Sequence, residues 1–189
     1  MPQKRNLTPE IIRRAAVEII EMNGAQALTM HSLADALGVK SPSLYNHVSG
    51  LREVWTMLAD EGLKQVIAAV RGAAIGRSAD TALREIAYAY RSFGLTRPHL
   101  YAAFDSLPRL DSKEVRAASS ELVGVLGQVL AVYHLEAEEQ TNIIRVLLVG
   151  LHGFVSRENA GFFTGPIPAD TTFERLIDSW LALLPRRQA

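Results

Sequence analysis

The chain has 189 residues, of which 48% are apolar and 21% are charged, so it can bury a core and is neither disordered nor collagen-like. This length predicts one domain or two small ones. The chain contains no cysteine, which excludes disulfides, thiolate metal sites and a cysteine nucleophile. Its start, MPQKRN, carries no apolar signal segment, and the longest apolar-rich run, Ile143–Val155, is too short for the roughly 20 residues of a membrane-spanning helix. We therefore expect a cytoplasmic protein with no membrane partner.

The charge is balanced overall but not along the chain. There are 20 basic and 20 acidic residues, yet residues 1–52 carry six basic residues against four acidic ones. A positive N-terminal part is compatible with phosphate binding, although chance variation among solvated side chains is an equal alternative.

Helical spacing of apolar residues recurs through the whole chain, and no segment alternates as a strand would. Thr8-Pro9-Glu10 predicts a helix start, since it combines an N-cap, a proline at the first helical position and an acid in the first turn. Gly24 is its predicted end. Thr29 is expected to cap a second, short helix that stops at Gly38, and Ser41-Pro42 repeats the cap-plus-proline signal for a third.

A longer fourth helix is predicted to start at Ser49-Gly50, and the pattern breaks at residues 72–78, our predicted boundary between two helical halves. Further helices are expected through residues 83–93, 98–106, 115–133, 136–159 and 170–184. The prediction is an all-α fold of about nine helices, with a three-helix N-terminal part and a helical C-terminal part.

Residues 29–48, TMHSLADALGVKSPSLYNHV, predict a helix-turn-helix. Gly38 can adopt the positive φ that reverses the chain, and the third helix then presents its first turn to solvent. The outward side chains there, Ser43, Tyr45, Asn46 and His47, all form hydrogen bonds and none is acidic. Asparagine can bond adenine at two atoms, while tyrosine and histidine commonly contact phosphates. The alternative is a helical hairpin with a solvated polar face.

In residues 8–66 the sequence resembles the N-terminal domain of the TetR family of transcriptional regulators. The match comprises Ala15/Ala16, Gly24, Leu28-Thr29, Leu33-Ala34, Leu37-Gly38-Val39 and Ser43-Leu44-Tyr45-x-His47-Val48. The resemblance implies a homodimeric repressor, more rarely an activator, with a DNA-binding domain at residues 6–66 and an effector-binding and dimerisation domain at residues 78–185. It also implies double-stranded operator DNA as a partner, and we expect release from the operator by a small, largely apolar effector.

By the same resemblance, residues of this segment match positions that contact DNA. Thr29, Tyr45 and His47 correspond to phosphate-anchoring positions, and His31, Ser41, Pro42 and Ser43 to positions near base edges. The whole predicted DNA-binding set is Thr29, His31, Lys40, Ser41, Pro42, Ser43, Tyr45, Asn46, His47 and Arg52. Leu51 stands where many members carry a lysine, and we expect Arg52 to replace that phosphate contact.

The C-terminal half predicts a dimer face. The run Ile143–Val155 is apolar nearly all round, so a helix there needs cover on most sides. With the stripe of the last helix, a two-fold axis would complete a four-helix interface; the alternative is the core of a monomer. The predicted interface residues are Gly150, Gly153, Ser156, Phe173, Ile177, Trp180 and Leu181. The segment 151–158 also resembles a C-terminal subfamily with a Trp-His-Gly signature, although Gly150 and Leu151 replace the tryptophan.

Aromatic residues are concentrated between residues 88 and 104, and such side chains with polar tips suit a largely apolar effector. An aromatic core without a ligand is the alternative. The predicted effector-binding residues are Trp55, Leu58, Tyr90, Phe93, Tyr101 and Phe104.

The sequence indicates no catalytic set: it has no glycine-rich phosphate loop and no metal-ligand spacing among its five histidines. We therefore expect no enzyme activity, no cofactor and no metal site. Two other functions stay open, namely a small helical enzyme that uses the aromatic cluster and an adaptor whose N-terminal hairpin binds a partner protein.

Overall fold

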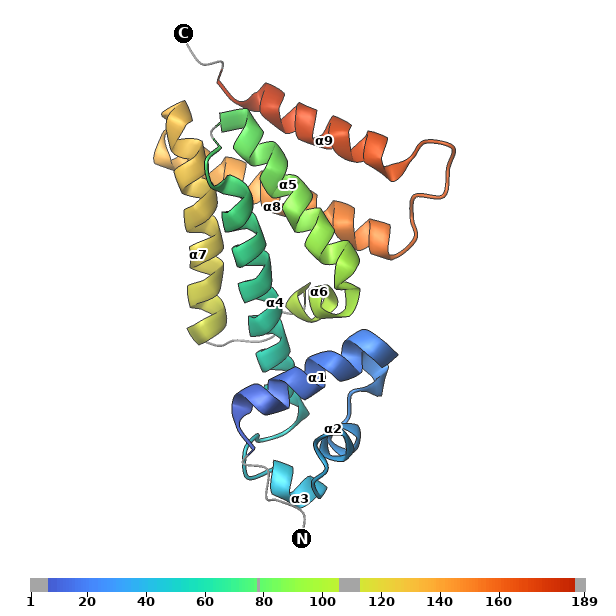
Figure 1. Cartoon of the computed structure of the whole chain (residues 1–189). Helices are drawn as coiled ribbons and strands as arrows, with labels where there is room; N and C mark the ends of the chain where they lie inside the picture. The colour runs from blue at the N-terminus through green and yellow to red at the C-terminus, as the bar shows by residue number, and fades with distance from the viewer. Residues whose placement is uncertain (1–6, 78, 106–112, 186–189) are drawn as a thin grey trace. The chain divides into compact units, whose positions relative to one another are not determined.

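The computed structural model describes residues 7–77, 79–105 and 113–185. These residues form nine α-helices, two short 3-10 helices and no strand (Figure 1), which confirms the predicted all-α class. No helix among them is both long enough and apolar enough to cross a membrane. The α-helices are α1 Pro9–Asn23, α2 Met30–Leu37, α3 Ser41–Leu44, α4 Leu51–Ala74, α5 Ala79–Thr96, α6 Pro98–Asp105, α7 Lys113–Leu130, α8 Ala137–Asn159 and α9 Ala169–Leu183.

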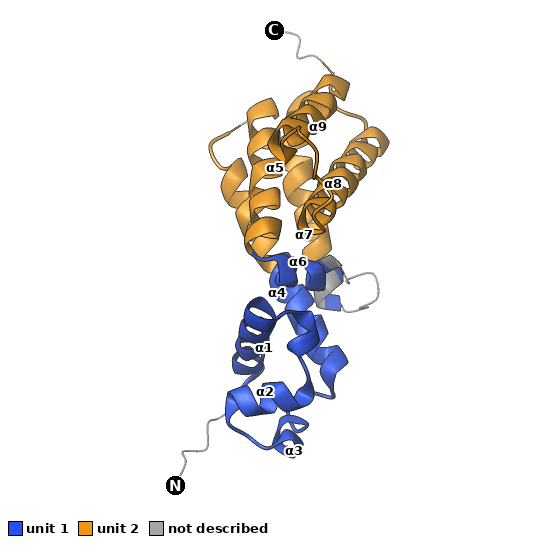
Figure 2. Ribbon diagram, turned by 90° about the vertical axis from the view of Figure 1, so that its right-hand side faces the viewer, with its two compact units in different colours: residues 1–63, 97–116 blue, residues 64–96, 117–189 orange. Residues whose placement is uncertain are grey.

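The chain divides into two compact units (Figure 2). Unit 1 comprises residues 1–63 and 97–116, and unit 2 comprises residues 64–96 and 117–189. The division falls inside α4, so this helix contributes to both units. Residues of α6 follow α5 in the chain but group with the N-terminal helices, because α6 packs against α1.

Local signals explain the first two helices of unit 1. The Thr8 hydroxyl accepts a hydrogen bond from the backbone N–H of Ile11 at 3.3 Å, and Gly24 ends α1 with a φ of 81°. Thr29 and Ser32 form a capping box at the start of α2, and Gly38 ends α2 in the left-handed region with a φ of 69°. All four predicted helix boundaries are thereby confirmed.

The third helix differs from the prediction at both ends. Its N-cap is Lys40, without a side-chain hydrogen bond, so Ser41 is the first helical residue rather than the cap. The helix ends at Leu44, and a turn over Tyr45–His47 follows, in which the His47 N–H bonds the Leu44 carbonyl at 2.9 Å. Tyrosine, asparagine and histidine all have weak helix propensity, which explains why the chain tightens there instead of continuing the helix.

Unit 2 is built around α5, α8 and α9, which contact one another pairwise. As predicted, Leu83, Ile86, Ala87, Tyr90 and Phe93 of α5 all face inward and are buried. On α8 the buried residues are Ile144, Leu147, Leu151, Phe154 and Val155, and on α9 they are Phe173, Ile177 and Trp180.

Helix α8 is not buried on all sides within one chain. Val146 is 51% exposed and Val149 is 72% exposed, so a strip of its apolar surface faces solvent. On the covered side, a Cβ atom at Gly150 would overlap the Trp180 ring. The lack of a side chain at Gly150 is therefore needed for α8 and α9 to pack inside a single chain.

Candidate nucleic-acid interface and effector site

The reading segment consists of α2, the turn at Gly38 and α3. Leu33, Leu37 and Leu44 are buried and hold the two helices together. The Val39 N–H donates to the Ala34 carbonyl at 3.0 Å, which closes the turn. Since the core of this hairpin is fixed, its outer side chains have defined positions on the surface of unit 1.

The structure places almost the whole predicted DNA-binding set on the surface. Nine of the ten residues are exposed, and Ser41 is half-buried. Tyr45 is 54% exposed, a large fraction for an aromatic side chain in a packed domain. Its ring and the adjacent Asn46 and His47 follow α3 directly, so that this turn, rather than the helix itself, carries three of the predicted contacts.

Acidic side chains in this part of the surface are either absent or bonded to a neighbouring residue. No acidic residue occurs between Gly38 and Arg52. Glu53, the first acid after them, accepts hydrogen bonds from the Ser49 N–H and the Ser49 hydroxyl, both at 2.7 Å. The Ser49 backbone bond, followed by the hydroxyl bond, lowers the pKa of the Glu53 carboxyl. The Glu53 carboxylate therefore holds Ser49 against the first turn of α4.

Two of the residues predicted to bind DNA also interact with neighbouring side chains or backbone in unit 1. His31 Nε2 lies 3.3 Å from Asp35 Oδ2, one helical turn later, so an acid stands beside His31 on α2. The Thr29 hydroxyl accepts from the Ser32 N–H at 3.0 Å. The four-residue spacing of His31 and Asp35 signals such a pair within one helix.

The predicted effector residues are distributed over both units. Trp55, Leu58, Tyr101 and Phe104 belong to unit 1, where the Tyr101 and Phe104 rings meet edge to face with centroids 5.9 Å apart. Leu58 and Tyr101 are buried, and Trp55 and Phe104 are half-buried. Tyr90 and Phe93 belong to unit 2 and are buried on α5.

The predicted interface residues fall into two groups. Phe173, Ile177 and Trp180 are buried within unit 2, and Gly150 lies under Trp180. Ser156 and Leu181 are half-buried. Gly153 is exposed, and a Cβ atom there would meet nothing within 4 Å. The apolar side chains that do face solvent in this region are Val146, Val149 and Leu183.

Comparison with known proteins identifies the family. Residues 83–180 match the tetracyclin repressor-like C-terminal domain. The HTH-type transcriptional regulator Rv0681 of Mycobacterium tuberculosis is 31% identical over 182 residues, which are 96% of this chain and 83% of the relative. The HTH-type transcriptional regulator YobS of Bacillus subtilis is 31% identical over 156 residues, or 82% of this chain and 80% of the relative.

Solved structures show the same fold. A protein from Rhodococcus sp. RHA1 superposes with a TM-score of 0.81 at 20% identity, covering 97% of this chain and 98% of that one. The TetR family regulator PfmR from Thermus thermophilus gives 0.66 at 20% identity, with 93% and 99% covered. BioQ in complex with its double-stranded DNA operator gives 0.69 at 20% identity, also with 93% and 99% covered.

The chain belongs to the TetR family of transcriptional regulators. Its family and its homologues are regulators and not enzymes, so the TetR family resemblance of the sequence is confirmed and the reading as a helical enzyme is wrong. The described part of this TetR regulator holds no group of three histidine, cysteine, aspartate or glutamate residues that could hold a metal ion.

The C-terminal unit of this TetR regulator also contains a buried charge cluster that sequence analysis missed. Arg91 of α5 is only 8% exposed. Its Nε and Nη2 atoms donate to the two carboxylate oxygens of Glu158 at 2.7 and 2.5 Å, and Nη2 also donates to Asp170 at 2.7 Å. The guanidinium carbon lies 4.7 Å from the centroid of the Phe173 ring. These bonds, with the Glu158 bond first, raise the pKa of Arg91 against the opposing effect of burial.

A signal for this cluster was present in the sequence. Arg91 lies between Ala87 and Gly94 on the inward face of α5, and all three are buried. A charge on an apolar face requires a partner, yet the partners Glu158 and Asp170 are 67 and 79 residues away. Spacing along one helix could not identify them.

Proposed function

We propose that this TetR regulator is a homodimeric repressor that binds operator DNA through the segment at residues 29–48 and Arg52, and is released by a small, largely apolar effector. The carrying observation is the exposed turn after α3, where Tyr45, Asn46 and His47 protrude next to Ser43 with no acid from Gly38 to Arg52. Phosphates and base edges accept and donate the hydrogen bonds that these side chains offer.

Selection of bound duplexes from random DNA tests the proposal. We expect a pseudo-palindrome with two half-sites centred about one helical turn or somewhat more apart, because each protomer presents one reading segment to the major groove. Selection that enriches no sequence, together with capture of a protein partner in the absence of DNA, would favour the adaptor function instead.

The proposed dimer rests on the open strip of α8 and α9. Val149 and Leu183 are each 72% exposed and Val146 is 51% exposed. Val146 and Leu183 line the same hollow on unit 2, and an exposed apolar surface of this kind is typical of protein contacts. Phe173 and Ile177 are buried in their own chain, so their proposed role is to support α9 from within, while Val146, Val149, Gly153 and Leu183 meet the partner.

Gly153→Leu is expected to convert the dimer to monomers. In the single chain a Cβ atom at this position meets nothing within 4 Å, so we expect the clash to come from a partner lying against α8. Val149→Asp should act similarly, since an unpaired charge in an apolar contact costs several kcal/mol. Sedimentation equilibrium measures the result, and circular dichroism checks that the helices remain.

Gly72→Leu is the matched control for this test, because Gly72 is also an exposed helical glycine with open space around its Cβ position. It should sediment as the wild type does. Trp180→Asp is a poorer test, since Trp180 packs against Gly150 within the chain. A wild-type protein that is monomeric at micromolar concentration contradicts the proposed assembly.

The proposed effector response depends on the aromatic residues of each unit. Release of DNA by a factor of 100 needs about 2.7 kcal/mol of differential effector affinity between two conformations. Burial of about 100 Å² more apolar surface in one conformation supplies that amount at about 25 cal/mol per Å². Helix α4 contributes to both units, and a ligand that binds one of its conformations more tightly shifts the population toward it.

Phe104→Ala in unit 1 and Phe93→Ala in unit 2 are expected to weaken the effector response while leaving DNA affinity without effector nearly unchanged. Phe93 is buried, so Phe93→Leu is included as a variant that leaves a smaller cavity. DNA-binding titrations with compounds drawn from the chemistry of the neighbouring genes measure the response. A normal response in both alanine variants places the effector site elsewhere.

A further inference from the structure

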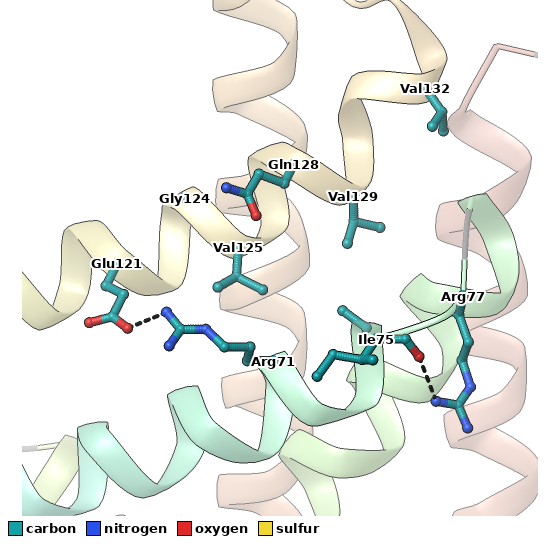
Figure 3. Close-up of a pocket in the computed structure, with 10 residues that line it drawn as sticks. Arg71, Ile75, Arg77, Glu121, Gly124, Val125, Gln128, Val129 and Val132 are labelled. Atoms are coloured by element: carbon teal, nitrogen blue, oxygen red, sulfur yellow. Dashed lines mark hydrogen bonds and ion pairs between the residues drawn. The ribbon is translucent and has the colours of Figure 1, made fainter.

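Unit 2 carries an open groove between the C-terminal end of α4 and the C-terminal half of α7 (Figure 3). Its volume is about 530 Å³, within the range of small-molecule sites. None of its ten lining residues is among those predicted to bind the effector. The groove is therefore a separate feature of the C-terminal unit.

The groove combines an apolar floor with a charged rim. Val125 and Val129 of α7 and Ile75, just beyond α4, supply apolar surface, and Ile75 is 71% exposed. Arg71 and Arg77 bring two guanidinium groups from the α4 side. A ligand with an apolar body and one negative group fits this arrangement. Its apolar body can cover the exposed isoleucine, and its negative group can bond a guanidinium.

The guanidinium groups are held loosely enough to be shared with a ligand. Arg71 forms an ion pair with Glu121 of α7, and both side chains are about half exposed, at 56% and 46%. Arg77 Nη1 donates to the Ala73 carbonyl at 3.1 Å (Figure 3 shows its weaker bond to the Ile75 carbonyl), and its Nη2 lies 4.0 Å from Glu85. Exposed ion pairs contribute little to stability, so exchanging one carboxylate for another costs little.

We propose that this groove binds a small amphipathic carboxylate. Its alkyl chain lies along the valines and Ile75, and its carboxylate binds Arg71. The bound anion takes the place of the Glu121 carboxylate on the guanidinium. Gly124 leaves room for the alkyl chain of the ligand, because a Cβ atom there would meet nothing within 4 Å. None of the lining residues belongs to the proposed effector-binding or DNA-binding sets.

Isothermal titration calorimetry with octanoate, and with 1-octanol as its uncharged counterpart, tests the site on the full chain. Wild type should bind octanoate at one site per chain. Gly124→Leu fills the groove and should weaken binding by about tenfold or more. Gly72→Leu makes the same change at an exposed helical glycine outside the groove and should leave binding unchanged.

Two charge variants have opposite expected signs. Arg71→Gln removes the guanidinium and should weaken octanoate about tenfold while leaving octanol binding unchanged, since charge-assisted bonds are lost only with the anion. Glu121→Gln removes the competing carboxylate and should tighten octanoate binding by a few fold. A purely structural role of the Arg71–Glu121 pair would not produce a gain.

Three outcomes would overturn the proposal. The first is no octanoate binding to wild type up to millimolar concentration. The second is unchanged binding in Gly124→Leu, which would place any bound octanoate elsewhere, including the proposed effector site. The third is weaker binding in Glu121→Gln. Helical circular dichroism and thermal melting confirm that each variant is folded, and a leucine in place of an exposed helical glycine favours the helix.

Discussion

Operator affinity is expected to fall about a thousandfold when Tyr45 and His47 are both replaced by alanine. Both side chains are exposed in the turn after α3, where they are proposed to donate hydrogen bonds to phosphates. A dimer loses four such bonds, and at about 1 kcal/mol each the loss is about 4 kcal/mol. Fluorescence anisotropy with the selected operator measures the change.

Two single variants distinguish contacts with DNA phosphates from contacts with base edges. Tyr45→Phe removes only the hydroxyl and should weaken binding by a similar factor on every sequence, because phosphates carry no sequence information. Ser43→Ala should instead relax the preference at one position of each half-site, by roughly 1–3 kcal/mol if Ser43 contacts a base directly. Comparison of the selected operator with single-base variants distinguishes the two effects.

Salt dependence adds a second, independent readout. Arg52→Gln should reduce the slope of log K against log salt by about one for each half-site, since each lost cation releases one fewer counterion. Met22→Ala is the control, because Met22 is 81% exposed at the end of α1, outside the reading segment. Wild-type affinity in the double variant, Tyr45→Phe and Ser43→Ala alike would show that another element reads the DNA.

The helix boundaries of unit 1 could be predicted because their signals are local. Thr8, Thr29, Gly24 and Gly38 each determine a cap within a few residues of themselves. The early end of α3 could not be predicted in the same way, because no proline or glycine stands between Leu44 and His47. There the backbone follows a weak propensity and the packing of Leu44 and Val48, which are both buried.

The sequence of α8 shows that the helix is apolar nearly all round, but it does not show which of its sides is covered by other helices. Val146 and Val149 are as apolar as their buried neighbours Leu147 and Leu151, yet they face solvent in the single chain. Coverage depends on where α5 and α9 lie, and this is a property of tertiary structure. The same limit applies to Arg91, whose carboxylate partners come from α8 and α9.

Glu158→Ala is expected to lower the free energy of unfolding of the C-terminal unit by about 3–5 kcal/mol, because it leaves the buried Arg91 guanidinium without its main partner. Arg91 and Glu158 side chains are only 10% and 14% exposed, so water cannot fully replace the lost bonds. Asp170→Asn is the matched control. The Asp170 side chain is 82% exposed, and its pair with Arg91 should be worth about 0–1 kcal/mol, as for other exposed pairs.

The two tryptophans of the chain allow this unit to be followed by itself. Trp55 belongs to unit 1 and Trp180 to unit 2, so a Trp55→Phe background leaves a fluorescence signal from unit 2 alone in urea titrations at fixed protein concentration. The double variant Arg91→Met/Glu158→Leu should recover most of the loss, since apolar residues can replace a buried ion pair without leaving an unpaired charge. Equal, small effects of Glu158→Ala and Asp170→Asn would mean that Arg91 is held by its packing on Phe173 rather than by its carboxylates.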